Sequence, residues 1–386
     1  MCASGPGRGP DRLRVLVVNA GSSSLKLSLL GDDDETLAER ELPAPRARVD
    51  ERELRAALEA GLRDADAVGH RIVHGGEHFR QPMLIDETVE AALRELVALA
   101  PLHQAKSLAA LDAVSSALSG LPAVACFDTA FHATLSPEVR TYAVPAQWRE
   151  RWGLRRFGFH GLSHGWVARR VPELLRRPSA GLRVVSCHLG AGASLCAIAD
   201  GCSVDTTMGF TPLEGVVMAT RSGSVDPGLL LWLMERTGMP ARELADTLEH
   251  GSGLLGLAGT ADMREVLARA AAGDEPARLA REVYVHRLRA GVGAMATSLG
   301  GLDALVFTGG VGENSPEIRE RAISGLGFHG LGIAADADLD PGGDRDLSAA
   351  GARASAVVMR AREDLEIARQ VRATIRRPEA RRAGAP

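Results

Sequence analysis

Residues 184–227 read VVSCHLGAGASLCAIADGCSVDTTMGFTPLEGVVMATRSGSVDP, and the rest of the chain can be interpreted around them. An apolar run leads into the small-residue stretch 189–192, a second apolar run covers 193–199, and Asp200-Gly201 follows. This order predicts a strand, a turn, a second strand and a tight reversal. A turn of glycine and alanine lets backbone N–H groups approach phosphate oxygens closely, although an ordinary hairpin has the same pattern.

A similar pattern occurs near the N-terminus. Residues 13–30 read LRVLVVNAGSSSLKLSLL, with an apolar run ending at Asn19, a turn of small residues, and a second apolar run. One such hairpin in each half suggests two related domains that face each other. Two turns holding one phosphate chain would be typical of a phosphotransferase of the actin-like type.

Length, charge and cysteine usage limit the alternatives. A chain of 386 residues can form two domains with separate cores, and a net charge of -4 gives no reason to expect nucleic acid or a membrane as partner. No apolar run of about 18 residues is present, and residues 1–12 lack the apolar segment of a signal peptide. The cysteines have no paired spacing, which predicts buried free thiols and a cytoplasmic protein. They are Cys2, Cys126, Cys187, Cys196 and Cys202.

Several short motifs match the residue patterns of well-known sites but not the predicted structural context that those sites require. Residues 161–165, GLSHG, fit the nucleophile elbow of hydrolases, but no buried strand precedes them. Residues 251–256, GSGLLG, fit a dinucleotide fingerprint, but they follow a helical pattern, and no lysine is placed for a P-loop. His160 and His164 have metal-pair spacing without a third ligand nearby, so hydrogen bonding of His160 to an anion is favoured.

Polar residues in or after predicted strands are the candidates for catalytic and ligand-binding roles. Arg71 lies within a strand pattern, where its partner is either a local carboxylate or a substrate carboxylate. Asp128 follows a buried strand, where it either takes part in chemistry or caps the next segment. Residues 304–315, ALVFTGGVGENS, predict a strand, a glycine turn and a helix, suited to an adenine or ribose or to any tight turn. Glu363 begins a charged helix, where capping is the simpler explanation.

Taken together, the motifs resemble the acetate kinase family. They recur in family order from Asn19 to about Arg369, and as a set they are specific although each alone is weak. The matching stretches are NAGSSSLK at 19–26, GHRIVHGGE at 69–77, FDTAFH at 127–132, RFGFHGLSH at 156–164, SVDTTMGFTPLEG at 203–215, TRSG at 220–223, DMR at 262–264 and GGVGEN at 309–314.

The resemblance implies an α/β fold of two duplicated ribonuclease-H-like (actin-like ATPase) domains with an interdomain active-site cleft. It implies reversible transfer of a phosphoryl group from ATP to acetate or propionate, giving the acyl phosphate and ADP, with Mg²⁺ or Mn²⁺, in a homodimer. We expect the N-terminal domain at 13–130 plus 365–378, the C-terminal nucleotide-binding domain at 131–364, and disordered tails at 1–12 and 379–386.

The resemblance also assigns roles to individual residues. Arg71 and Arg221 would hold the substrate carboxylate and the transferring phosphoryl group, Asp128 would orient the acceptor, and His160 would stabilise charge in the transition state. Asn19 and Glu363 would hold the metal. The acyl pocket would comprise Val73, Leu102, Phe159 and Pro212, and the nucleotide would contact Ser22, Ser24, Lys26, His188, Leu189, Gly190, Ala191, Gly192, Asp262, Met263, Arg264, Gly310, Val311, Gly312, Glu313 and Asn314.

The chain departs from the family pattern at four places. Ala191 replaces the usual asparagine of the second hairpin, Ser224 replaces an acid, and Gln104 replaces an asparagine. Residues 360–362, Arg-Ala-Arg, replace Pro-Thr-Asn before Glu363, which weakens its placement on the metal. We therefore expect an active but slower kinase. The rival hypotheses are a butyrate-preferring kinase, against which Phe159 and Leu102 argue, and a degenerate nucleotide-binding regulatory protein, suggested by Ala191.

Overall fold

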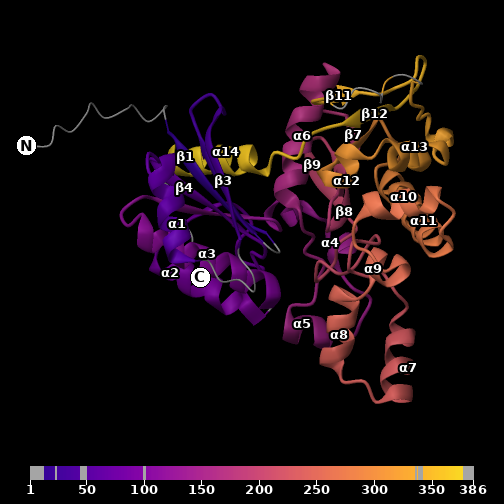
Figure 1. Cartoon of the computed structure of the whole chain (residues 1–386), viewed down its shortest axis with the longest axis horizontal. Coiled ribbons are helices and arrows are strands. Elements are labelled where there is room, and N and C mark those ends of the chain that lie inside the picture. The colour runs from indigo at the N-terminus through magenta and orange to yellow at the C-terminus, as the bar shows by residue number, and fades with distance from the viewer. Residues whose placement is uncertain are drawn as a thin grey trace, which may run out of the picture. The chain divides into compact units, whose positions relative to one another are not determined.

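The computed structural model describes residues 13–21, 24–43, 50–98, 101–334, 337 and 342–376, without the side chains at 51, 98 and 101–103. The expected tails at 1–12 and 379–386 lie outside the described residues. The chain divides into two compact units, whose elements are labelled in Figure 1. Unit 1 comprises Met1–Phe131 with Arg362–Pro386, and unit 2 comprises His132–Ala361.

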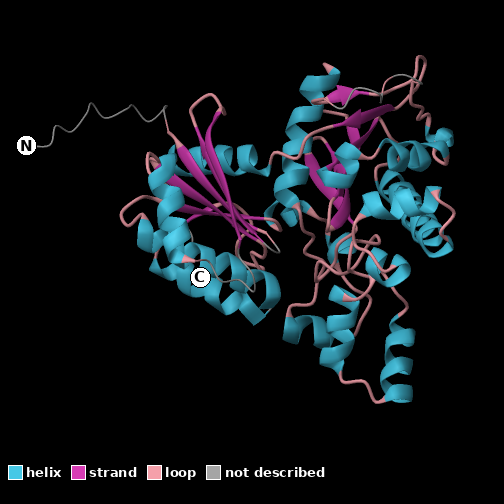
Figure 2. Cartoon of the chain, viewed as in Figure 1, coloured by secondary structure: helices cyan, strands magenta, loops and turns pink. Residues whose placement is uncertain are grey.

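Unit 1 is built on a six-stranded mixed sheet, drawn with its flanking helices in Figure 2. The strand order is β3-β2-β1-β4-β6-β5. Strands β1, β4 and β6 are parallel neighbours, whereas β2, β3 and β5 pair antiparallel. The strands are β1 (Val15–Ala20), β2 (Ser24–Leu30), β3 (Thr36–Pro43), β4 (Ala67–Ile72), β5 (Met83–Leu84) and β6 (Ala123–Phe127).

Unit 2 repeats this sheet. Its order is β11-β12-β10-β7-β8-β9, and β7, β10 and β12 are the parallel neighbours. Read from its opposite edge, this is the order of unit 1, including a two-residue antiparallel edge strand in each. The predicted duplication is therefore confirmed. The strands are β7 (Arg183–Leu189), β8 (Ala193–Ala199), β9 (Cys202–Thr206), β10 (Ala304–Thr308), β11 (Arg345–Asp346) and β12 (Ser355–Val358).

The helical periodicity of residues 49–65 predicts one helix in unit 1, and the observed α-helix is shorter. It begins at Glu51, where Asp50 accepts hydrogen bonds from two backbone N–H groups. It ends in a π-helical turn in which Gly61 has a φ of 112°, a conformation that favours glycine. The helices are α1 (Glu51–Ala57), its π turn (Leu58–Leu62), α2 (Glu87–Glu95), the 3-10 turn Leu96–Ala98, α3 (Pro101–Ala117) and α14 (Glu363–Arg376).

Unit 2 carries more helices than unit 1 in the described part of the chain. Residues 261–298, whose pattern predicts one long helical region, form two helices. Asp274 caps the second part by accepting a hydrogen bond from the backbone N–H of Ala277. The glycine stretch 309–314 is itself a short helix. The helices are α4 (Pro137–Arg140), α5 (Ala146–Trp152), α6 (Gly161–Leu175), α7 (Pro227–Thr237), α8 (Ala241–His250), α9 (Gly253–Ala258), α10 (Met263–Ala271), α11 (Glu275–Ser298), α12 (Gly309–Asn314) and α13 (Pro316–Ser324).

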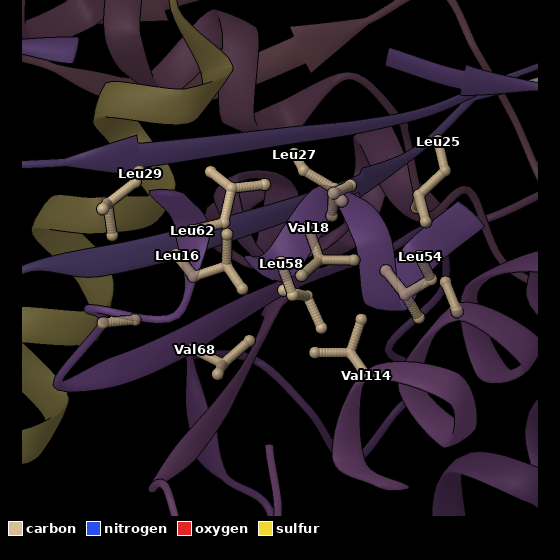
Figure 3. Packing of buried hydrophobic residues seen from close by; sticks show 13 residues of the cluster. Leu16, Val18, Leu25, Leu27, Leu29, Leu54, Leu58, Leu62, Val68 and Val114 are labelled. Atoms are coloured by element: carbon tan, nitrogen blue, oxygen red, sulfur yellow. The ribbon is translucent and has the colours of Figure 1, made fainter. Parts of the chain in front are cut away.

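One face of the unit 1 sheet packs on α1, its π turn and α3. Leu16 and Val18 of β1 lie on this face with Leu27 of β2, because alternate residues of a strand share a face. Figure 3 shows them with Leu58 and the other members of the cluster. Each fully buried leucine stabilises the fold by about 2 kcal/mol relative to an exposed one.

The other face of the same sheet packs on α14. A Cβ atom at Gly69 of β4 would lie 2.5 Å from Ile367 Cγ2 and 2.7 Å from Val371 Cγ2, so only glycine allows this close approach. The first residue of α14, Glu363, is consequently held beside the sheet of unit 1 although it comes from the far end of the chain. No helix in the described part of the chain is long and apolar enough to cross a bilayer.

Candidate active site

Arg71 and Asp128 meet where the parallel strands of unit 1 end. Arg71 lies near the carboxyl end of β4, and Asp128 follows β6, the next strand of the sheet. Arg71 Nη2 lies 2.7 Å from Asp128 Oδ2, and Arg71 Nε lies 3.1 Å from Asp128 Oδ1. This two-point geometry is the strong form of an arginine–carboxylate pair. Arg71 therefore has a local carboxylate partner in Asp128.

Asn19 and Glu363 complete this group, which we call the Arg71 cluster (Asn19, Arg71, Asp128 and Glu363). Arg71 Nη1 donates to Asn19 Oδ1 at 3.1 Å, and Asn19 Nδ2 donates to Glu363 Oε2 at 3.0 Å. Burial by itself would lower the pKa of Arg71, but the charges of Asp128 and Glu363 and the hydrogen bond to Asp128 raise it. The cluster thus holds one cation among two carboxylates and an amide.

The loop that follows β4 is fixed from two sides. The buried amide of Gln104 accepts from His74 N at 3.2 Å and donates to the His74 carbonyl at 3.3 Å. Gly75 N donates to Thr129 Oγ1 at 3.0 Å, which ties the loop to the residue after Asp128. In the sequence, Gln104 stands out only as a departure from the family pattern. Its fully buried amide retains hydrogen bonds to the backbone beside Val73, which is itself buried.

The turn of the second hairpin lies beside two predicted catalytic residues in unit 2. Gly190 N donates to the Gly192 carbonyl at 2.9 Å, which closes the turn between β7 and β8. A Cβ atom built at Gly192 would lie 3.3 Å from His160 Nε2 and 3.4 Å from Arg221 Nη1. His160 and Arg221, which are far apart in the sequence, therefore approach the same glycine. Both side chains are donors suited to an anion.

His160 is held in an unusual backbone conformation. It caps α6 with a φ of 56°, in the left-handed region that costs a residue other than glycine on the order of 1 kcal/mol. The buried His132 ring lies 3.0 Å from the carbonyl of Phe159, the residue before His160, and 2.8 Å from Ser203 Oγ. The His160 ring lies 4.3 Å, between centroids, from that of His188. His132 and His188 are thus neighbours of this segment that the motif alone did not identify.

Arg221 differs from Arg71 in its surroundings. Its Nη1 atom donates to the Pro212 carbonyl at 3.1 Å and contacts Met218 Sδ at 3.6 Å. No carboxylate among the described residues forms an ion pair with Arg221. Burial lowers the pKa of this guanidinium, and the charge of Glu249 acts in the opposite direction. A partly buried cation in this setting is suited to an anionic ligand.

The predicted adenosine residues fall on two different elements of unit 2. Gly309 precedes the predicted residues Gly310–Asn314, and a Cβ atom at Gly309 would lie 2.9 Å from the Leu189 carbonyl, so α12 packs directly against the end of β7. Glu313 Oε1 accepts from Gly309 N at 2.9 Å and from Ala361 N at 2.8 Å. The stretch Asp262–Arg264 instead begins α10, which packs on α9 and α11.

The other predicted residues have ordinary structural partners or lie outside the description. Ser24 Oγ donates to Glu41 Oε1 at 2.5 Å, and Lys26 is exposed on β2. Ser22 lies outside the described residues, as does the side chain of Leu102 in α3. Phe159 is fully buried, and Pro212 is buried as well.

The hydrolase-like and dinucleotide-like motifs lack the structural context that those sites require. Residues 161–165 lie inside α6, and 251–256 begin at the end of α8, so neither follows a strand. No group of three histidine, cysteine or acidic side chains in the described ranges could hold a metal ion. His164 is buried and hydrogen-bonds to two serines, Ser186 and Ser194.

Comparison with known proteins identifies the family of the chain. Residues 47–369, most of the chain, match the model of the acetokinase family. The chain belongs to the acetokinase family. An acetate kinase from Leifsonia xyli subsp. xyli is 45% identical over 388 residues, covering 92% of this chain and 97% of that protein.

Solved structures of this family have the same fold. The acetate kinase of Porphyromonas gingivalis superimposes with a TM-score of 0.86 at 34% identity, covering 94% of this chain and all of that one. A propionate kinase from Francisella tularensis subsp. tularensis SCHU S4 gives a TM-score of 0.86 at 33% identity, covering 94% and 99% of the two chains. The predicted fold class, two duplicated ribonuclease-H-like domains, is confirmed.

Membership of the acetokinase family also confirms the predicted enzyme class. The chain is a phosphotransferase that uses ATP and has the carboxyl group of a short acid as acceptor. ATP or ADP and a divalent metal ion are the cofactors that this family implies.

Proposed function

We propose that this enzyme catalyses the reversible transfer of the γ-phosphoryl group of ATP to acetate, with propionate as a second acceptor. The products are the acyl phosphate and ADP. The observation that carries this proposal is the approach of His160 and Arg221 to Gly192, together with an Arg221 guanidinium that no described carboxylate pairs with. Phosphoryl transfer through a loose transition state needs alignment and positive charge around the moving group.

In this mechanism the acid acceptor requires no general base. A carboxylic acid has a pKa of about 4, so acetate is already ionised at neutral pH. Arg71 would bind the acetate carboxylate, and Asp128 would orient the acceptor through Arg71. Arg221 and His160 would donate to the transferring phosphoryl group. Val73, Leu102, Phe159 and Pro212 would form a pocket of a size that suits acetate or propionate.

The nucleotide would be bound chiefly by unit 2. The turn at His188–Gly192 is proposed to bind the phosphates through backbone N–H groups, with Ser22, Ser24 and Lys26 along the phosphate path. The adenosine is proposed to lie near Asp262, Met263, Arg264 and the stretch Gly310–Asn314. The contact of Gly309 with Leu189 supports this placement, because it joins the phosphate turn to α12.

The metal is proposed to be Mg²⁺, with Mn²⁺ as an alternative. The Arg71 cluster offers the oxygen donors that such hard cations prefer, namely the Asn19 amide oxygen and the Glu363 carboxylate. Magnesium usually keeps several waters and is bound by one or two carboxylates together with substrate phosphates. When bound, the ion would supply charge to the phosphate oxygens. Asn19 and Glu363 would hold it directly or through water.

We propose that the N-terminal ribonuclease-H-like domain comprises 13–130 and 365–378, and that 131–364 form the C-terminal, nucleotide-binding ribonuclease-H-like domain. A reducing, cytoplasmic location is proposed as well. Three of the cysteines, Cys126, Cys187 and Cys196, are buried free thiols, which suits such a compartment.

A homodimer is proposed through α7. This helix has no buried residue, although it contains Leu229, Leu231 and Trp232, whose side chains are 46%, 62% and 57% exposed. Large exposed apolar side chains on a helix without a buried residue are typical of an interface. Sedimentation velocity on the full chain and on Leu231→Asp tests this. The wild type should sediment as a dimer and the variant as a monomer, whereas a monomeric wild type would contradict the proposal.

The substrate assignment is tested by acyl hydroxamate formation with acetate, propionate and butyrate under saturating Mg-ATP. We expect acetate to give the highest kcat/KM, propionate to follow, and butyrate to react poorly. A preference for butyrate would favour the longer-chain kinase. ATP binding without product from any acid would favour a regulatory, degenerate protein.

A further inference from the structure

Four buried or partly buried side chains of unit 2 form a continuous hydrogen-bonded chain, which we call the serine–histidine chain (Ser186, His164, Ser194 and His160). Ser186 Oγ lies 2.9 Å from His164 Nδ1. His164 Nε2 lies 2.9 Å from Ser194 Oγ, and Ser194 Oγ lies 2.9 Å from His160 Nδ1. The two serines and His164 are fully buried. The chain therefore begins in the interior and ends at His160.

The position of Ser194 restricts where the protons lie. A serine hydroxyl donates one hydrogen bond and accepts two, but here it contacts two imidazole nitrogens. If Ser194 donates to His160 Nδ1, then His164 must carry a proton on Nε2 and donate it to Ser194 Oγ. If Ser194 donates to His164 Nε2 instead, then His160 must carry a proton on Nδ1. A third arrangement, in which both rings donate to Ser194, leaves the hydroxyl proton of Ser194 without an acceptor, because these two nitrogens are its side-chain partners in the described residues.

Ser186 distinguishes the two arrangements. A neutral imidazole carries one proton, so His164 protonated on Nε2 accepts on Nδ1 and receives the hydroxyl proton of Ser186. In the opposite arrangement His164 Nδ1 donates to Ser186, and the Ser186 hydroxyl proton then lacks an acceptor. His164 Nδ1 is the only side-chain partner of Ser186 Oγ in the described part of the protein. A buried donor left unsatisfied is unfavourable, so the first arrangement is preferred.

The burial of His164 agrees with this assignment of its charge. Burial lowers the pKa of His164 well below its usual value, and His132 and His188 act in the same direction. His164 is thus neutral at physiological pH, as the proton count requires.

We infer that Ser194 is a positioning residue that, through His164 and Ser186, holds His160 as a neutral imidazole with its proton on Nε2. This nitrogen is the one that lies beside Gly192. His160 would then donate one hydrogen bond to a phosphoryl oxygen, while Arg221 supplies the positive charge. The inference rests on the proposed role of His160. Arg221 approaches the same glycine as His160, the ring of His188 lies 4.3 Å from the His160 ring, and His164 reaches His160 through Ser194.

The tautomer itself can be measured without following turnover. Long-range ¹⁵N–¹H spectra of ligand-free enzyme labelled in its histidines distinguish Nε2–H from Nδ1–H imidazoles. His160→Gln identifies the signals of His160 by their disappearance. We expect the Nε2–H pattern for His160 at pH 7.5. An Nδ1–H or doubly protonated pattern would overturn the inference. Because this readout does not depend on turnover, it stands or fails separately from the proposed kinase reaction.

Substitutions of Ser194 test the consequence for catalysis. Ser194→Ala removes the hydroxyl and should lower kcat about tenfold, the effect of losing the hydrogen bond that reaches His160, with KM values for ATP and acetate within twofold. Ser194→Thr keeps the hydroxyl but adds a methyl group at a fully buried position. If the hydroxyl of Ser194 positions His160, Ser194→Thr should have a higher kcat than Ser194→Ala. If Ser194 only fills space, Ser194→Thr should have the lower kcat, which would contradict the inference.

Ser203→Ala is the matched control. Ser203 is an equally buried serine whose hydroxyl lies 2.8 Å from a histidine nitrogen, His132 Nδ1, outside the serine–histidine chain. This variant should lose stability much as Ser194→Ala does, while the ¹⁵N signature of His160 stays unchanged. A change in that signature equal to the one in Ser194→Ala would show a general packing effect and overturn the inference.

Discussion

The guanidinium of Arg71 forms a two-point ion pair with the carboxylate of Asp128, which is only 1% exposed. Removing one partner of a buried pair leaves the other charge uncompensated. Arg71 is therefore coupled to the stability of unit 1 as well as to the proposed binding of acetate.

We predict that Arg71→Ala abolishes turnover and lowers the free energy of unfolding by about 3 kcal/mol, because Asp128 is left buried without its cation. ATP affinity should be retained, since the proposed nucleotide contacts lie mainly in unit 2. Urea unfolding, isothermal calorimetry with ATP and steady-state kinetics measure the three quantities. The double variant Arg71→Ala, Asp128→Ala should recover stability but not activity. A loss of ATP affinity as large as the loss of turnover would instead make Arg71 a purely structural residue.

Arg221→Ala should differ from Arg71→Ala in its effect on stability. Because Arg221 has no carboxylate partner among the described residues, its removal leaves no buried anion behind, and stability should change by less than about 1 kcal/mol. Turnover should fall by about a thousandfold if Arg221 stabilises the transferring phosphoryl group. Thermal unfolding and kcat measured on the same preparation check both parts. A variant that unfolds as readily as Arg71→Ala would show that Arg221 has a structural role.

Gly192→Ala should reduce kcat with little effect on stability. The added methyl would lie 3.3 Å from the His160 ring and 3.4 Å from Arg221 Nη1, so both donors must shift. Gly293→Ala in α11 is the control, because a Cβ atom there meets no atom within 4 Å. The control should keep its kinetics and gain roughly 0.5–1 kcal/mol of stability from the higher helix propensity of alanine. Equal kinetics for the two variants would contradict the arrangement around Gly192.

Ala191→Asn should raise kcat/KM for ATP severalfold. Ala191 is exposed in the hairpin turn, so an asparagine fits there and adds a side-chain donor toward the phosphates. Initial rates at varied Mg-ATP with saturating acetate measure the change. Ala191→Ser, which adds a shorter donor, should give a smaller increase. An unchanged KM for ATP in both variants would mean that the backbone donors of the turn are sufficient.

Stability should decrease as the pH falls from 6.5 toward 4. Burial lowers the pKa of His70 to about 3, and burial is also the main cause that lowers the pKa of His132 to about 4. In this pH range the unfolded chain binds protons that the folded protein does not, so acid favours unfolding. Each such histidine contributes about 1.4 kcal/mol per pH unit.

Urea unfolding at pH 7.5, 6.0 and 5.0 checks this dependence. His70→Leu removes one of the buried histidines, and the slope of the unfolding free energy against pH should decrease by about one proton. A variant with the slope of the wild type would show that His70 is not the titrating group.

The strands and turns were largely predictable from the sequence. Residues 193–199, a second apolar run after a small-residue turn, form β8 over Ala193–Ala199. Helix ends were less predictable, because Gly61 and Asp274 act through a backbone conformation and a cap rather than through the apolar pattern. The stretch 309–314 was expected as a turn, yet it forms α12 once Gly309 packs on the backbone of Leu189.

The sequence by itself determined the duplicated hairpins, the family and the identity of the polar residues at the strand ends, since these depend on local patterns and ordered motifs. Only the tertiary structure decided which of those residues have partners. Arg71 is paired with Asp128, whereas Arg221 pairs with no described carboxylate, and Ser194 links His160 to the interior. These contacts join residues far apart in the chain, and their energies depend on burial and on proton placement. Neither quantity is present in the order of the amino acids alone.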